Sequence, residues 1–296
     1  MKKTVAILTL ATSLCLPLQA APVLRFEFSE SGSSQESTGT APLSLTTYQS
    51  ASAPDNYVTS VAPGAPSVGT GMALNFTSQN LEGAKASASG TLSADPAYAA
   101  LTSNLGSFTV TAWVSDLNAK TDRRRLFFLS GGTTRAIDIF FSTGANGNVM
   151  SLAVAGSGTE SPERIVTSAP SVFVPNGNNE WYFVAVTYDA TSGATSFYAG
   201  AQDDLLKTSS TILLNSSGQV YTMPTNSTTV NIGNSSVGAT GVFDGYLSDV
   251  RFYGEVLDAQ SIEALHAVPE PSTAAILGLG LGVVTVCQFA LHKGKN

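Results

Sequence analysis

The chain has 296 residues, of which 43% are hydrophobic and 12% charged, with 14 Lys and Arg against 21 Asp and Glu. This acidic balance, with no basic tract longer than three arginines, excludes a nucleic-acid partner, and the hydrophobic content excludes a disordered chain. With only two Cys and two His, the chain also lacks the residues for most metal-centred and thiol chemistry.

The first 21 residues have the three parts of a secretory signal peptide. Lys2 and Lys3 form a positive start, an apolar stretch runs from Thr4 to Leu18, and the small residues Ala20 and Ala21 follow. This order is typical of a segment that is removed on export. We therefore expect residues 1–21 to be a signal peptide, with cleavage after Ala20 or Ala21.

Between residues 22 and 267 the hydrophobic pattern has the period of two that is typical of β-strands. Clusters of Gly, Asn, Ser and Asp separate the strands, and no helices alternate with them, which predicts one all-β sandwich over residues 22–267. Residues 22–70 are partly loop-rich: from Ser29 to Thr70 there are few large apolar side chains, so we expect long loops around one or two strands. The run from Leu205 to Thr229 has the same character. The clearest predicted strands are Leu24–Phe28, Phe108–Val114, Ile137–Phe141 and Trp181–Tyr188.

The one basic cluster of this body is Lys120-Thr121-Asp122-Arg123-Arg124-Arg125, which precedes the apolar run Leu126–Leu129. We expect a solvated loop that protects the apolar strand from aggregation. Docking to an acidic polysaccharide or surface is the alternative.

One helical pattern stands near the end of the body, from Asp258 to His266. Asp258 is suited to cap the first turn, and Ile262 and Leu265 fall on one face of such a helix.

Five segments resemble, in order, the motifs of laminin-G-like domains of the concanavalin A type. The resemblance spans about Gly71 to Leu265 and implies an antiparallel two-sheet jelly roll, closed by a short helical turn at Leu257–Leu265. The other matching segments are Gly71-Met72-Ala73-Leu74-Asn75-Phe76, Phe108-Thr109-Val110-Thr111-Ala112-Trp113-Val114, Trp181-Tyr182-Phe183-Val184-Ala185-Val186-Thr187-Tyr188-Asp189 with Tyr198-Ala199-Gly200, and Val230-Asn231-Ile232-Gly233 with Phe243 to Tyr253.

The same resemblance implies a calcium ion at one rim of the sandwich, and the candidate ligands are Asp189, Asp244 and Asp249. Calcium binds six to eight oxygen atoms, which carboxylates, carbonyls and water supply. Each of the three residues also has a structural interpretation, which we favour. Asp189 and Asp244 stand where turns are expected, and Asp249 can hold a neighbouring loop by hydrogen bonds.

Sugar binding would use exposed aromatic rings with polar neighbours, and the surface-facing candidates are Tyr188, Tyr198 and Tyr246. A tyrosine on a strand more often packs against its neighbours, so this is the weaker of two interpretations. Trp113 and Trp181 lie in the motif strands, where the resemblance implies a role in packing.

The fold that the resemblance implies also includes glycoside hydrolases, which need two carboxylates on either side of one glycosidic bond. In the glucanases these come from a single strand with the pattern Glu-x-Asp-x-x-Glu or a near variant, and no strand here has it. We therefore expect that the chain is not an enzyme.

The last 29 residues, 268–296, resemble the PEP-CTERM sorting signal. The motif Val268-Pro269-Glu270-Pro271-Ser272-Thr273 precedes an uncharged span over 273–291, and Lys293 and Lys295 follow. Such a span is long enough to cross a bilayer, and the basic tail would stay on the cytoplasmic side. The resemblance implies that an exosortase, a membrane-embedded protease, cleaves near the Pro-Glu-Pro, often in species that make extracellular polysaccharide. A plain C-terminal membrane anchor is the alternative.

Removal of both ends leaves a body without cysteine, because Cys15 lies in the signal peptide and Cys287 in the span. The body keeps 10 basic and 20 acidic residues. Together the segments predict an exported bacterial protein, membrane-anchored before processing and then at the cell surface or outside the cell. We expect its jelly-roll domain to bind carbohydrate or another matrix component. A structural matrix protein without a specific ligand is the alternative, and a glycoside hydrolase is a weaker one.

Overall fold

The computed structural model describes most of the predicted body. The described residues are 20–28, 34–36, 39–40, 43–48, 73–75, 87–92, 96–103, 105–115, 124–131, 134–144, 147–154, 164–174, 180–215, 217–221, 227–234, 243 and 245–267. Most of the predicted signal peptide, the sorting motif, the membrane span and Asp244 lie outside these residues.

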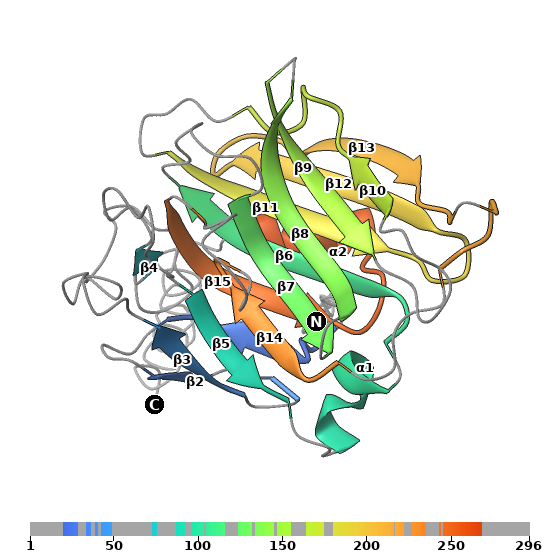
Figure 1. The fold of residues 1–296 in the computed structure, drawn as a ribbon. Coiled ribbons are helices and arrows are strands. Elements are labelled where there is room, and N and C mark those ends of the chain that lie inside the picture. Colours follow the sequence, from blue (N-terminus) through green and yellow to red (C-terminus); the bar gives the residue numbers. More distant parts are fainter. Residues whose placement is uncertain are drawn as a thin grey trace, which may run out of the picture.

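Two antiparallel sheets lie face to face, which confirms the predicted sandwich (Figure 1). We call them sheet A and sheet B, and every pairing in both is antiparallel. Sheet A has the order β1 (Leu24–Phe26), β15 (Tyr246–Tyr253), β6 (Phe108–Ser115), β11 (Trp181–Tyr188), β12 (Ala194–Ala201) and β13 (Lys207–Ile212), and β4 (Leu74–Asn75) also pairs with β15. Sheet B has the order β10 (Arg164–Thr167), β9 (Gly147–Val154), β8 (Thr134–Gly144), β7 (Arg124–Gly131), β14 (Thr229–Ile232), β5 (Ser87–Thr91), β3 (Ser44–Tyr48) and β2 (Ser34–Glu36).

The main core fills the space between the sheets, where strands such as β6 and β11 contribute every second side chain. Phe252 of sheet A stacks on Phe127 of sheet B with ring centroids 5.7 Å apart, and on Phe108 of the neighbouring strand at 6.1 Å. Aromatic contacts of this kind add to the stability that the buried area itself supplies. The two layers are therefore joined through rings that both sheets contribute.

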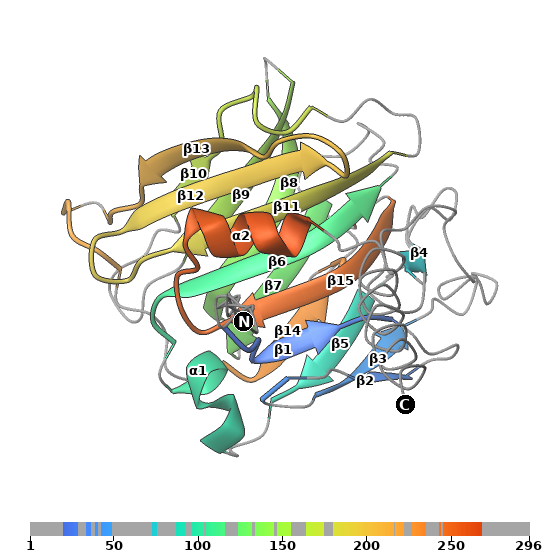
Figure 2. The ribbon, with the colours of Figure 1, turned by 180° about the vertical axis from the view of Figure 1, so that it is seen from behind.

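A second apolar cluster covers the outer face of sheet A, where helix α2 (Ala259–His266) lies across the strands (Figure 2). Asp258 caps the helix, because its carboxylate accepts a 2.7 Å hydrogen bond from the Ser261 N–H, as predicted. Ile262 and Leu265 are buried against the sheet. Under and around them lie Ala73, Trp113, Trp181, Phe183, Ala185, Tyr253 and Leu257.

A 3-10 turn (η1, Pro96–Tyr98) and the one-turn helix α1 (Ala99–Thr102) connect β5 to β6. The sequence pattern predicted one helical segment only, so this pair is a correction. One turn has too few residues to show a helical period, and its apolar side chain Leu101 is buried in the main core.

Candidate functional site

Asp189 follows β11 and closes the turn into β12. Its carboxylate accepts a 2.8 Å hydrogen bond from the Thr191 N–H and a 2.7 Å bond from the Ser192 hydroxyl, with Ser107 as a more distant donor. The bond from the Thr191 backbone and then that from Ser192 lower the pKa of Asp189 below its ordinary value of 3.8. The side chain therefore organises its own turn.

Asp249 lies in a β-bulge of β15 with a φ of +46°, a conformation that few residues other than glycine adopt. Arg25 of β1 donates to its Oδ1 from Nε at 2.9 Å, and Arg251 donates to the same oxygen at 2.9 Å and to Oδ2 from its Nη2. Burial by itself raises the pKa of Asp249, but the hydrogen bonds and positive charges of Arg251 and Arg25 outweigh it, so the pKa is lowered. Asp249 thus ties the first strand of the sheet to the last.

These contacts bear on the predicted calcium site. Asp189 and Asp249 belong to separate hydrogen-bond groups, and two guanidinium groups beside Asp249 disfavour a further cation there. Within the part of the chain that the structure describes, no three His, Cys, Asp or Glu side chains are grouped as metal ligands would be. Asp244 lies outside that part, so a calcium site built from all three stays a prediction.

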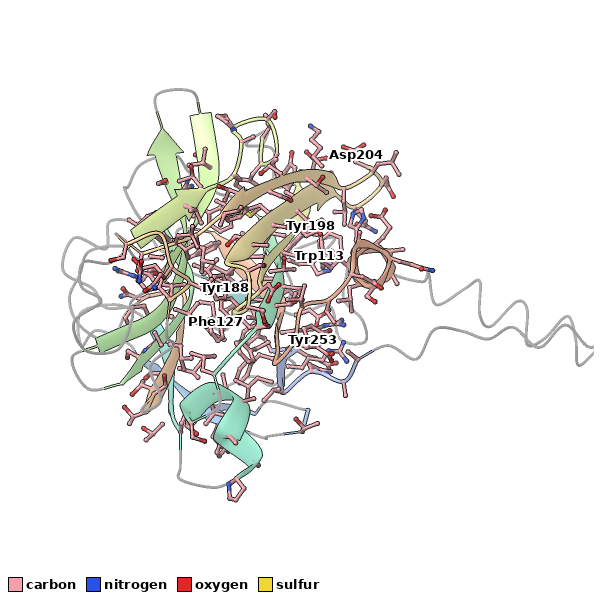
Figure 3. The ribbon with its side chains drawn as sticks, turned by 90° about the vertical axis from the view of Figure 1, so that its right-hand side faces the viewer. Trp113, Phe127, Tyr188, Tyr198, Asp204 and Tyr253 are labelled. Carbon is pink, nitrogen blue, oxygen red and sulfur yellow. The ribbon has the colours of Figure 1, made fainter. Side chains whose placement is uncertain are left out.

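Tyr188 does not face the surface, and this expectation was wrong. Its ring is fully buried between the sheets, 5.5 Å from that of Phe108 (Figure 3). The reason is that Tyr182, Val184 and Val186, on the same side of β11, all point into the main core.

Tyr246 and the two tryptophans belong to the outer cluster of sheet A. Tyr246 is half-buried, with its ring 6.4 Å from that of Trp181. Trp113 packs against Phe183 at 5.4 Å and against His266 of α2 at 5.7 Å, and both tryptophans are buried. The expected packing role of Trp113 and Trp181 is confirmed.

Tyr198 is the predicted ligand-binding residue that the structure places among accessible hydroxyl groups. It is half-buried on the outer face of β12, with Thr208 of β13 directly opposite and exposed. Ser196, on the same face of β12, shares a 2.8 Å hydrogen bond with the exposed Ser210 of β13. We call this group, Tyr198, Ser196, Thr208 and Ser210, the hydroxyl shelf.

The shelf combines one aromatic ring with three hydroxyl groups. A tyrosine ring offers an apolar face of the size of a sugar ring, and each serine or threonine hydroxyl both donates and accepts hydrogen bonds. Thr208 and Ser210 were not predicted as site residues, because the run from Leu205 to Thr229 is mostly polar and was expected to contain long loops. The family resemblance at Tyr198-Ala199-Gly200 marked β12, but nothing in the sequence identified its partner strand.

Two arginines of the basic cluster lie inside β7 and are buried, so the expectation of a solvated loop was wrong for them. Arg125 donates from Nε to both carboxylate oxygens of Asp138 at 3.1 Å, and its guanidinium lies 5.5 Å from the centre of the Phe128 ring. Arg124 donates to the Asn148 side chain at 2.9 Å. Opposite charge on the neighbouring strand β8 allows Arg125 to be buried.

Among the described helices, neither α1 nor α2 has the length and apolar character needed to cross a membrane. The predicted span over 273–291 lies outside the residues that the structure describes, so the membrane anchor stays a prediction.

Comparison with known proteins identifies the fold. Among curated proteins none matches this chain in sequence. The binding domain of botulinum neurotoxin DC, described in complex with SialylT, superposes with a TM-score of 0.50 at 10% identity over 84% of this chain. The binding domains of serotype D/C VPI 5993 and serotype G also reach 0.50, at 12% and 13% identity. The chain spans about half of each of these proteins, 52%, 52% and 50%.

The laminin-G resemblance is borne out by a family match over most of the jelly roll. Residues 86–263, from the start of β5 into α2, match Laminin_G_3, the family described as the concanavalin A-like lectin/glucanases superfamily. This match covers more than half of the chain, and both sheets contribute strands to it. The chain therefore belongs to the concanavalin A-like lectin/glucanases superfamily.

Proposed function

We propose that this chain is an exported, non-enzymatic protein of the bacterial cell surface or extracellular matrix, and that its laminin-G-like domain binds carbohydrate through the hydroxyl shelf. The observation that carries the proposal is the position of Tyr198, a half-buried ring at the edge of the outer cluster of sheet A, with the hydroxyls of Ser196, Thr208 and Ser210 on the same face of strands β12 and β13. In the related fold of botulinum neurotoxin DC, the binding domain is described with SialylT bound. Membership of a superfamily that includes lectins also supports carbohydrate as the ligand class.

The contacts suit a neutral sugar. The apolar face of a pyranose ring can lie on Tyr198, and its hydroxyls can exchange hydrogen bonds with Thr208 and Ser210. The excess of acidic over basic residues in the body repels anionic polymers. Extracellular polysaccharide without charge, or another hydroxyl-rich matrix component, is the partner that this surface favours.

The absence of enzymatic activity is part of the proposal. A glycoside hydrolase needs one carboxylic acid and one carboxylate that are free to act on a substrate. Of the buried carboxylates in the described residues, Asp138 is held by Arg125, and Asp249 by Arg25 and Arg251. Such ion pairs leave neither group free to donate a proton.

Export and sorting complete the proposal and rest on the two ends of the sequence. Residues 1–21 direct the chain across the inner membrane, and the span over 273–291 anchors it there until an exosortase-type protease cleaves near Pro269-Glu270-Pro271. The sorting elements precede the basic tail in the required order, which is the observation that supports an exosortase over a plain anchor.

A glycan array probed with the wild-type protein and with Tyr198→Ala tests the binding proposal. Loss of the ring removes the stacking surface, so we expect at least a tenfold weaker affinity, or about 1.4 kcal/mol, for each glycan that the wild type binds. Tyr198→Phe keeps the ring and should retain most of the affinity. Repeating the array with calcium and with a chelator shows whether an ion takes part.

Ile165→Ala is the matched control, since Ile165 is an exposed apolar residue on β10 of the other sheet. Its affinities should equal those of the wild type. A wild-type protein that binds no glycan in either condition would contradict the proposal and favour a structural matrix protein without a ligand. Equal binding by wild type and Tyr198→Ala would remove the shelf as the site.

A further inference from the structure

We propose that β13, the last strand of sheet A, pairs with β13 of a second copy of this chain about a two-fold axis at Ser210. The pairing joins the hydroxyl shelves of the two copies into one surface. Only the use of this joined surface for carbohydrate rests on the proposed function. The pairing itself depends on the backbone, the apolar side chains and the charges of β13.

One edge of β13 has backbone groups without a partner. Strand β12 pairs with the other edge in an unbroken antiparallel register, and no described strand pairs with the outer one (Figure 2). The Leu213 N–H donates to the Gly193 oxygen at 2.8 Å, and the backbone groups of an antiparallel strand alternate in direction from residue to residue. The N–H and C=O groups of Thr208, Ser210 and Ile212 therefore point away from β12.

This edge lacks the features by which many proteins prevent strands from pairing edge to edge. Strand β13 has no proline and no bulge, and its single charged residue is Lys207 at its first position. Leu205 before the strand and Ile212 at its end are 84% and 62% exposed, more than any other large hydrophobic side chain of the described residues. Exposed apolar side chains on both sides of an unpaired edge indicate an interaction surface.

The strand is complementary to a second copy of itself. With the axis at Ser210, this residue lies opposite Ser210 of the other copy, and Thr208 lies opposite Ile212. Each outward N–H then meets an outward C=O, as in the hydrogen-bonded pairs of an antiparallel ladder. The side chains of all three residues also stay on the outer face of sheet A, because they alternate with Ser209 and Thr211. One patch, used twice, thus forms a closed dimer.

Apolar contact and charge favour the same register. Ile212 of each copy lies against the methyl group of Thr208 of the other, which covers an exposed apolar side chain. Lys207 falls outside the paired span and opposite Leu213, so the two lysines of the dimer lie about 20 Å apart. This separation is more than twice the Debye length of about 8 Å at physiological ionic strength, so their repulsion is screened.

The dimer has two tyrosine rings on one continuous face. Tyr198 lies opposite Thr208, one strand in from the edge. Across the axis the two β12 strands are separated by about three strand spacings, and their Tyr198 residues are offset by about four positions, which places the rings roughly 20 Å apart. An extended glycan can contact both rings, so the dimer should bind a repeating polysaccharide more tightly than one copy does.

Disulfide cross-linking tests the pairing without any glycan. Ser210→Cys is introduced into the full chain together with Cys15→Ser and Cys287→Ser, so that each copy has one thiol. At the axis, opposite Cα atoms are about 5.5 Å apart, which a disulfide can bridge. Lys207→Cys in the same background is the matched control, because it is exposed on the same strand but lies about 20 Å from its counterpart. We expect mild oxidation to cross-link the Ser210→Cys chain at least tenfold faster, as measured by non-reducing electrophoresis.

A charged variant provides a second measurement. Ser210→Lys places two ammonium groups opposite each other, so we expect at least tenfold weaker self-association than in the wild type, measured by light scattering in a non-ionic detergent. Gln260→Lys adds the same charge on the exposed side of α2 and should associate like the wild type.

Three results would overturn the pairing: a monomeric wild type, equal cross-linking at positions 207 and 210, or a Ser210→Lys chain that associates as strongly as the wild type. Since no glycan is present in either measurement, a glycan array without binding leaves these results unchanged. The dimer and the carbohydrate ligand can therefore fail separately.

Discussion

At the scale of single residues, Asp249 shows how one carboxylate can join distant parts of a chain. Its two arginine partners are Arg25 of β1 and Arg251 of β15. Arg25 lies 224 residues before Asp249 in the sequence, whereas Arg251 lies only two residues after it. The bulge and the positive φ turn this side chain toward both guanidinium groups. A structural role for Asp249 was one of two interpretations of the sequence. Its ion pairs with Arg25 and Arg251 could not be predicted, because they depend on the pairing of β1 with β15.

Asp249→Asn should lower the free energy of unfolding by about 3 kcal/mol, because it leaves the buried guanidinium of Arg251 without its counter-charge, whereas the partly exposed Arg25 keeps its ion pair with Glu27. Asparagine tolerates positive φ, so the backbone is not the cause of the loss. Chemical denaturation at pH 7 measures the effect. Asp203→Asn, at an exposed position in the turn after β12, should change stability by less than about 0.5 kcal/mol.

The same variant has a defined pH dependence. The pKa of Asp249 is lower in the folded chain than its ordinary value of 3.8. Its contribution is therefore fully present above the unfolded pKa and is lost as the pH falls through the folded pKa. The difference in stability between wild type and Asp249→Asn should stay constant above about pH 5 and shrink below about pH 4. A difference that grows as the pH falls would contradict the ion pairs.

At the scale of elements, the strands were predictable and their buried faces were not. Alternation located β6 and β11, and it correctly placed Tyr182, Val184, Val186 and Tyr188 on one side of β11. Both sides of β11 are buried, however, because α2 covers the side that faces away from sheet B. A period of two separates two faces but does not say which one meets solvent, and this is why Tyr188 was misplaced.

Helix α2 was predictable, because an N-cap residue and a 3.6-residue apolar period coincide in its sequence. Strand β13 was not, because five of its six residues are Lys, Ser or Thr and its exposed positions require no apolar period. The hydroxyl shelf depends on β13. Thr208 and Ser210 could therefore not be proposed from the sequence, and of the two shelf residues on β12 only Tyr198 was.

Ile262→Ala tests the docking of α2. The side chain is fully buried against sheet A, so its loss should lower the free energy of unfolding by about 2–5 kcal/mol. The fluorescence of Trp113 and Trp181 should shift to longer wavelength if the helix separates from the sheet. Gln260→Ala, on the exposed side of the helix, is the control, and a shift in both variants would contradict the assignment.

At the scale of the whole molecule, the jelly roll and its family follow from ordered motifs that the structure confirms. The ends do not follow from the fold, because a signal peptide and a sorting segment are recognised by other proteins and not by packing. The cellular location of the protein therefore needs a separate experiment.

The intact mass of the protein, recovered from source cells and from the medium, tests whether both predicted terminal segments are removed. Loss of residues 1–20 or 1–21, together with the residues after the Pro-Glu-Pro motif, is the expected result. A chain in the membrane fraction that keeps residues 268–296 would show a plain anchor, and the exosortase would then have no role.

The pairing of β1 with β15 has a consequence for the order in which the chain can fold. Synthesis produces β1 first, yet the only partner of this strand within the described sheets is the last strand to be made. Because β15 also lies between β1 and β6, sheet A cannot close until almost the whole domain exists. Bringing together two strands so far apart in the sequence slows folding. During export, β1 therefore stays without its partner until β15 has crossed the membrane.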